Sequence, residues 1–409
     1  MIEWLYDSLA IAIVLIVLYY FFGTKVGRSR LWKATVTPLA SIIGSGFLVS
    51  GPLLLKTTGA WATLVMTAIT IIAYGVGASI RFNIQHIEPQ LKDDDAKFYL
   101  IRKLESLSKP ALGIAYLISV TFYLKLLSAF ALKGFQIVNT TIENVLTTGV
   151  LLFIGTFGFF KGLVILEHVE TYSVNIKLAI IFALTSCFFL YNLELVATHQ
   201  WHLPAESNDT LWSGFRKILG MLIIVQGFET SRYLGEAYRA KVRVKTMRHA
   251  QWLSAIVYVV FVAVSSVLFV HIGKVSETTV IDLSREVTHM LPYLLIIAAI
   301  LSQFSAAISD TLGGGGLLTE ALNYKITSNT CYVLISACAI GLTWSANIYE
   351  IITIASQAFA LYYALQLLVS MYGVMIKRAE TKHWILLEIL FTSLFILMLM
   401  VLTLSLPFE

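Results

Sequence analysis

The chain has 409 residues, of which 58% are hydrophobic and only 13% are charged, and its mean hydropathy is +0.80. One soluble core could not bury so much apolar surface, so the composition excludes an ordinary soluble globular protein. The formal charge of +5 comes from basic residues scattered over several loops, which excludes the concentrated basic face of a nucleic-acid-binding protein. The sequence therefore indicates an all-α polytopic membrane protein that lies in the lipid bilayer.

About twelve segments are long and apolar enough, or nearly so, to cross the hydrocarbon as helices, which takes roughly 17–25 residues. In chain order they are Ser8–Phe22, Lys33–Leu55, Ala60–Ile80, Ala111–Phe135, Leu146–Phe160, Glu167–Leu193, Gly214–Tyr233, Ala250–Ile272, Pro292–Leu312, Thr330–Ser345, Ile348–Ile376 and Trp384–Leu406. The first could be read as a secretory signal, but Glu3 and Asp7 stand where a basic start belongs. We interpret it as a retained span.

These spans divide the chain. The predicted parts are an extra N-terminal span with its loop (1–32), a first five-span repeat (33–193), an outer loop (194–213), a second five-span repeat (214–376) and a C-terminal span (377–409). Placing the basic loops in the cytoplasm puts both termini outside. The prediction is an integral protein of the bacterial inner (plasma) membrane.

Two spans carry interruptions at corresponding positions. The second span contains SIIGSGFLVSGPLL, with Gly44, Gly46 and Pro52, and the seventh reads GMLIIVQGFETSRYLGE, with Gly227 and Glu229. A helix interrupted within a bilayer leaves backbone groups without partners, which is costly unless something polar occupies the gap. For the second span alone, close helix packing is the alternative. Each repeat has an odd number of spans, so the two are inverted, and paired interruptions in inverted repeats indicate a transporter's midplane site.

These motifs resemble those of the amino acid–polyamine–organocation (APC) superfamily. The run IIGSGFLVSGPLLLKTTGAWA resembles that family's first helix, and GFETSRYLGEAYRAKVRVKTMRHA resembles its sixth, without the usual Asn-Pro of the following loop. VNIKLAIIF resembles its fifth helix and GGLLTEAL its eighth. The resemblance covers roughly residues 33–376. It implies the LeuT-type fold, a five-plus-five inverted repeat with two broken helices, here with one extra helix at each end.

A substrate site is expected where the two interruptions meet. The first break would leave free amides at a positive helix end, where a carboxylate would bind; the residues are Gly44, Ser45, Gly46 and Phe47. The resemblance implies that the second break offers carbonyls to the substrate's amino group, at Val225, Gln226 and Gly227, with Phe228 beside them. A side chain added at Gly46 is expected to fill the carboxylate's space and leave the protein folded. The prediction is a secondary active transporter, working by alternating access, for an amino acid or a related amine-carboxylate.

Four charged residues lie well inside predicted spans: Lys125, Lys177, Glu229 and Asp310. Each is costly in hydrocarbon and indicates a transport pathway, a proton relay or a counter-ion. Lys125 lies too far from the end of its span for its side chain to reach water, so a buried partner is expected. Glu229 is expected to gate the site or sense protons, with a structural partner at the helix terminus as the alternative.

The coupling ion has two candidates. The resemblance places Lys177 where proton-coupled members carry a lysine, whose ammonium fills the position that sodium takes in relatives. Against this, Ser305 and Ser309 lie one turn apart on one helix face and could bind a sodium ion together with carbonyls of the second span. Two cations in one pocket would repel each other. We predict that Lys177 is held near Asp310 and the two serines, with coupling to protons or by exchange; a sodium-coupled symporter is the alternative.

Other chemistry is sparse. No catalytic arrangement stands out, so the chain is not expected to be an enzyme, and no cofactor other than a coupling proton or sodium ion is predicted. His199 and His202 form an H-x-x-H in an outer loop, where a solvated loop is expected and a surface metal site is the alternative. A transporter-like sensor or scaffold that binds without transport is the alternative from another class. The sequence indicates no protein partner.

Overall fold

The computed structural model describes residues 2–92, 95–163, 169–205, 207, 209–235, 238–271, 275–378 and 383–408. Over these residues the regular structure is helical, with no strand. Nine described helical stretches are long and apolar enough to cross a membrane, and one of them, Arg30–Leu91, contains two of the predicted spans. The all-α polytopic membrane architecture is therefore confirmed.

Each predicted span corresponds to helical structure, although the expected start of the sixth span, Glu167, lies outside the described residues. The helices are α1 (Ile2–Gly23), α2 (Lys25–Arg28), α3 (Arg30–Ser45), α4 (Phe47–Thr58), α5 (Ala62–Phe82), α6 (Tyr99–Gly134), α7 (Thr140–Lys161), α9 (Val169–Ala197), α10 (Leu211–Leu219), α11 (Thr230–Tyr233), α12 (Ala240–Ser265), α13 (Thr279–Val287), α14 (Leu291–Ala321), α15 (Ser328–Ser345), α16 (Ile348–Ile376) and α17 (Trp384–Leu404). Short turns of helix are η1 (Gly59–Trp61), η2 (Asn83–Ile87), η3 (Glu88–Lys92), η4 (Ala96–Phe98), η5 (Leu222–Val225) and η6 (Ser266–His271).

Both predicted interruptions are present. α3 ends at Ser45 and α4 begins at Phe47, with Gly46 between them and no side chain capping the first amides of α4. In the seventh span, α10 is followed by η5, and helix resumes only at Thr230. Gly227, between η5 and α11, has a φ of +114°, a backbone conformation that favours glycine. The second break is therefore the wider of the two.

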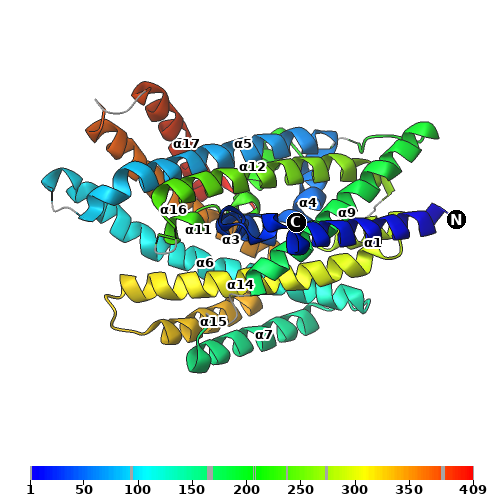
Figure 1. The fold of residues 1–409 in the computed structure, drawn as a ribbon, viewed down its shortest axis with the longest axis horizontal. Coiled ribbons are helices and arrows are strands. Elements are labelled where there is room, and N and C mark those ends of the chain that lie inside the picture. The colour runs from blue at the N-terminus through cyan, green and yellow to red at the C-terminus, as the bar shows by residue number, and fades with distance from the viewer. Residues whose placement is uncertain are drawn as a thin grey trace.

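The helices around the breaks form two groups. α6 packs against α14 and α16, and α15 packs against both α14 and α7. α12 packs against α3 and α5, and it lies beside α5 in the upper part of Figure 1, whereas α14, α15 and α7 lie in the lower part. Because α3 also contacts α9 and α14, the first break is enclosed between the two groups.

The main difference from the predicted boundaries is in α6, which starts at Tyr99 and not at Ala111. The additional turns carry charged residues, so they lie outside the apolar run from which the span was predicted. Two of these charges are paired with other helices: Glu105 with Arg232 of α11, and Lys109 with Glu320 of α14. These tertiary ion pairs allow a polar segment to continue as helix beyond the apolar run.

The extra N-terminal helix α1 packs along α9. The hydroxyl of Tyr6 donates to Glu194 Oε2 at 2.9 Å. The nearly buried Asp7 Oδ1 accepts from the backbone amides of His289 and Met290, both at 3.0 Å, at the start of α14. A side chain from α1 therefore caps α14 across the fold, which gives the extra helix a role in positioning α14.

We expect Asp7→Ala to destabilise the protein by about 1–2 kcal/mol, because the two amides at the start of α14 lose their acceptor. Asp7→Asn keeps an acceptor oxygen and should lose less. The measurement is the apparent midpoint of thermal unfolding of the purified protein in detergent. A midpoint for Asp7→Ala equal to that of the wild type would show that the cap does not hold α14.

Candidate functional site

The two breaks are in direct backbone contact. A Cβ atom added to Gly46 would lie only 2.4 Å from the Cα atom of Ile224, and one added to Gly227 would lie 2.5 Å from Ser41 Oγ. Each separation is shorter than real Cβ contacts. Because neither glycine has a side chain, the two broken helices can approach each other this closely. We call the contact between the two breaks the junction.

Two tyrosines from neighbouring helices hold this junction. The hydroxyl of Tyr258 on α12 lies 2.8 Å from the carbonyl oxygen of Ile42 and 2.7 Å from that of Ile224, so it bridges both broken helices. On α6, Tyr123 accepts a hydrogen bond of 2.8 Å from Gln226 Nε2. Sequence reasoning missed both tyrosines, because a single tyrosine in an apolar run gives no signal of the carbonyls that it contacts.

The residues predicted for the substrate lie on the two segments that meet here. They are Gly44, Ser45, Gly46 and Phe47 from the first break, and Val225, Gln226, Gly227 and Phe228 from the second. The ring of Phe47 packs against Tyr258 of α12, and that of Phe228 stacks on Tyr363 of α16 with centroids 5.3 Å apart. The two aromatic residues thus pack against helices on the two sides of the junction.

Glu229 lies in the second break, and its side chain bonds to the backbone there. Its side chain is fully buried, and its Oε2 accepts from the Gly227 amide at 2.9 Å and from the Tyr363 hydroxyl at 2.8 Å. Its other oxygen, Oε1, has no hydrogen-bond partner among the described residues. Glu229 therefore bonds within the second break, and one of its oxygens has no partner among the described residues. Its gating or proton-sensing role stays a prediction.

Lys177 reaches the first break from α9. Its Nζ donates to the carbonyl oxygen of Ala40 at 3.1 Å and to Ser302 Oγ at 3.2 Å. The hydroxyl of Ser302 in turn lies 3.2 Å from the carbonyl oxygen of Gly44. The ammonium therefore lies where α3 carbonyls and an α14 hydroxyl meet.

This α14 hydroxyl differs from the expected ones. The expected hydroxyls were those of Ser305 and Ser309, whereas the structure brings Ser302 to the lysine. Ser302 stands one turn before Ser305 on the same helix face, so helical spacing contained a signal for it. Periodicity identifies a face, but it does not tell which turn of that face meets α9.

Asp310 is buried on α14 and bonds to α6. It is 2% exposed, and its Oδ2 accepts a hydrogen bond from Ser119 of α6. Asp310 lies two turns after Ser302, roughly 12 Å along α14. Its bond to Ser119 joins α6 to α14, and the expectation that Lys177 is held near Asp310 stays a prediction.

Lys125 has buried partners, but they belong to neither break. Its Nζ lies 3.2 Å from Asn144 Oδ1 of α7, 3.2 Å from the carbonyl oxygen of Ala346 and 3.5 Å from that of Thr343. A cation beside the last carbonyls of a helix is favourable. The structure therefore places Lys125 at the end of α15 and does not bring it to the junction.

The histidine pair is exposed, and the cavity at the junction is small. His199 and His202 are both exposed after α9, and the described residues contain no group of three or more His, Cys, Asp and Glu side chains that could hold a metal ion. At the junction, a cavity of about 10 Å³ lies beside Tyr258. The polar groups of the junction are thus closed off in this structure.

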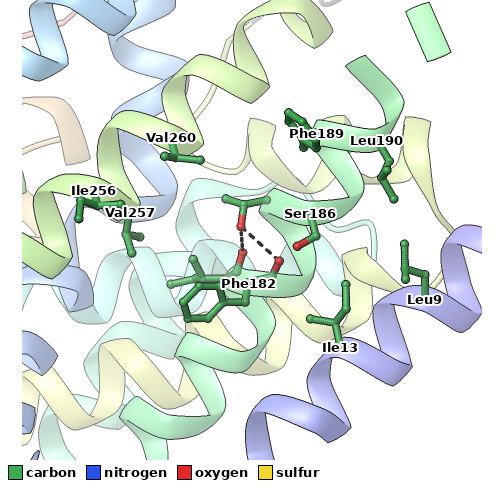
Figure 2. A pocket seen from close by; sticks show the side chains of 11 residues that line it. Leu9, Ile13, Phe182, Ser186, Phe189, Leu190, Ile256, Val257 and Val260 are labelled. Carbon is green, nitrogen blue, oxygen red and sulfur yellow. Dashed lines mark hydrogen bonds between the residues drawn. The ribbon is translucent and has the colours of Figure 1, made fainter. Parts of the chain in front are cut away.

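A larger groove of about 440 Å³ lies between α1, α9 and α12. Figure 2 shows Leu9 and Ile13 of α1 on one side of it, with α9 and α12 supplying the rest. Thr185 in its wall donates its hydroxyl to the carbonyl oxygen of Ile181 at 2.6 Å. With an apolar lining and this hydroxyl already bonded, the groove resembles a lipid-facing surface more than a polar ligand site.

Comparison with known proteins adds independent information. A family model described as an APC superfamily transporter matches residues 24–405. A relative from Aquifex aeolicus (strain VF5), named "uncharacterized protein", is 42% identical over 368 residues, with 89% of each chain covered.

Solved structures with a similar fold are also found. Mhp1, a nucleobase-cation-symport-1 family transporter solved in a closed conformation with bromovinylhydantoin bound, superposes with a TM-score of 0.58 at 10% identity, over 90% of each chain. A mutant of the Eremococcus coleocola manganese transporter superposes with a TM-score of 0.56 at 13% identity, over 92% of this chain and 87% of that one. At such low identity, the two likenesses show the fold alone.

Proposed function

Because this chain belongs to the APC superfamily of transporters, we propose that it moves an amino acid or a related amine-carboxylate across the membrane by alternating access. The observation that carries the proposal is the junction of the two broken helices. Among the described residues, no side chain caps the start of α4, which suits a carboxylate, and one oxygen of the buried Glu229 has no partner, which suits an amine. A zwitterion satisfies both ends.

The proposed coupling uses protons or exchange and needs no sodium. Its support is the position of Lys177, whose ammonium contacts a carbonyl oxygen of α3 and the hydroxyl of Ser302. Carbonyl and hydroxyl oxygens are the ligands that a hard cation would take. With an ammonium already there, a second cation would be repelled in a low-dielectric pocket. Lys177 thus takes the place of a bound sodium ion.

We expect proteoliposomes containing the protein to take up radiolabelled L-amino acids equally well when external sodium is replaced by choline at fixed pH. Lys177→Met should lose this uptake, because the pocket then lacks a cation altogether. The matched control is Lys133→Met, which removes a lysine paired with Asp282 at the partly exposed end of α6. Its uptake should equal that of the wild type.

Two outcomes would contradict this proposal in different ways. Loss of uptake in choline, with rescue by added sodium, would show that transport is coupled to sodium. Ser305 and Ser309 would then be candidate sodium ligands. Saturable amino-acid binding without any uptake would favour a sensor or scaffold over a transporter.

A further inference from the structure

Gln303 of α14 has an unusual hydrogen-bond balance. Its side chain is 1% exposed, and its Nε2 donates to the carbonyl oxygen of Gly44 at 2.8 Å. Because that carbonyl can only accept, the orientation of the amide is defined. The side-chain carbonyl oxygen, Oε1, then has no hydrogen-bond partner within the described part of the chain.

Gln226, in the second break, is also buried with only one half of its amide bonded. Its Nε2 lies 2.8 Å from the hydroxyl of Tyr123, and its Oε1 is unpartnered among the described residues. Because a tyrosine hydroxyl can donate as well as accept, the amide can take either orientation, and in both one of its polar atoms is left unpartnered. A buried polar atom without a partner is unfavourable, so a ligand with N–H groups would satisfy Gln303, and one that also has a carbonyl would satisfy Gln226 in either orientation.

The two glutamines bond to, or belong to, the two segments that meet at the junction of the broken helices. Gln303 is bonded to Gly44, and two residues later Gly46 abuts Ile224, which in turn lies two residues before Gln226. The contacts therefore run from one amide through the junction of the broken helices to the other. The proposed substrate would lie between them.

The charges nearby determine which kind of donor fits. A Cβ atom on Gly44 would lie 3.8 Å from Lys177 Nζ, so the carbonyl that holds Gln303 is next to a positive charge. A second cation beside Gln303 would be repelled. At the other side, the unpartnered oxygen of Glu229 is close in sequence to Gln226 and suits an ammonium. The Gln303 side of the junction thus favours a neutral N–H donor.

We propose that Gln303 and Gln226 form a subsite for the substrate's side chain and select amino acids that end in a carboxamide or a ureido group. This inference rests on the proposed function. Such a side chain offers a neutral N–H donor to Gln303 Oε1, and its own carbonyl and N–H groups suit either orientation of the Gln226 amide. A side-chain carboxylate would face the Gln303 oxygen with no proton to donate, and a thioether or hydrocarbon would leave both glutamines unsatisfied.

The test is equilibrium binding to the purified full chain in detergent. The probes are L-glutamine, L-asparagine and L-citrulline, compared with L-glutamate and L-methionine, which have a similar size to L-glutamine. We expect the first three to bind at least about tenfold more tightly than the last two, since one satisfied buried hydrogen bond supplies that much selectivity. Equal affinities for L-glutamine and L-methionine would overturn the inference.

Substitutions of the two glutamines test whether they cause the preference. Gln303→Met and Gln226→Met each remove one polar side chain at similar volume and should abolish most of the preference for L-glutamine. The control is Gln357→Met on α16, whose amide donates to Ser405 away from the junction, and it should keep the preference. A preference retained in both junction variants would overturn the subsite even if one variant folds poorly. Unselective binding of all five, or binding only of other amino acids, would overturn the subsite alone, whereas a chain that binds no amino acid at all would overturn the proposed function as well.

Discussion

Gly46→Ala is expected to destabilise the protein by about 3 kcal/mol or more and to abolish transport. The added Cβ would lie 2.4 Å from the Cα atom of Ile224, and backbone cannot move aside as the end of a flexible side chain can. Overpacking of a well-packed core typically costs about 1–3 kcal/mol, and contact with backbone belongs at or above the upper end of that range. The two breaks would have to separate, which removes the proposed site.

The matched control for this substitution is Gly316→Ala in α14, where a Cβ would meet nothing within 4 Å. Alanine is a better helix former than glycine, so this variant should be neutral or more stable by up to about 1 kcal/mol. Apparent unfolding midpoints and proteoliposome uptake test the pair. A wild-type midpoint for Gly46→Ala would contradict the close contact, and it would restore the expectation that a side chain there only fills substrate space.

Glu105→Ala is expected to cost about 3–5 kcal/mol, because it leaves a buried guanidinium without its counter-charge. The pair joins Glu105 Oε1 of α6 to Arg232 Nη2 of α11 at 2.8 Å, and both side chains are less than a tenth exposed. Arg243 of α12 adds to the same contact by donating to the carbonyl oxygen of Arg232 at 2.6 Å. The short helix after the second break thus depends on this pair for its position.

An exposed ion pair on the same helix provides the control. Lys109, one turn after Glu105, pairs with Glu320, and these side chains are 34% and 43% exposed. Glu320→Ala should therefore cost less than about 1 kcal/mol. Unfolding midpoints compare the two variants, and hydrogen exchange of residues 230–233 should accelerate only in Glu105→Ala. Equal effects of the two substitutions would show that the buried pair does not hold α11.

The sequence by itself determined the membrane class, the helical spans and the two breaks. These features follow from local properties, namely the length of an apolar run and the presence of glycines or a charge inside it. Gly46 and Glu229 could be singled out on that basis, since a glycine weakens the helix that contains it and a carboxylate is costly inside an apolar span. The resemblance to the APC superfamily depended on the same residues, and the family match agrees with it.

Only the tertiary structure decided which residues meet across the fold. Ser302, Ser305 and Ser309 share one face of α14 and are equivalent by periodicity, so the contact of Lys177 with Ser302 depends on how far α14 is shifted along α9. That shift is set by side-chain packing over the whole interface. The same reason applies to Asp7, whose role as a cap of α14 requires two helices far apart in sequence to be brought together.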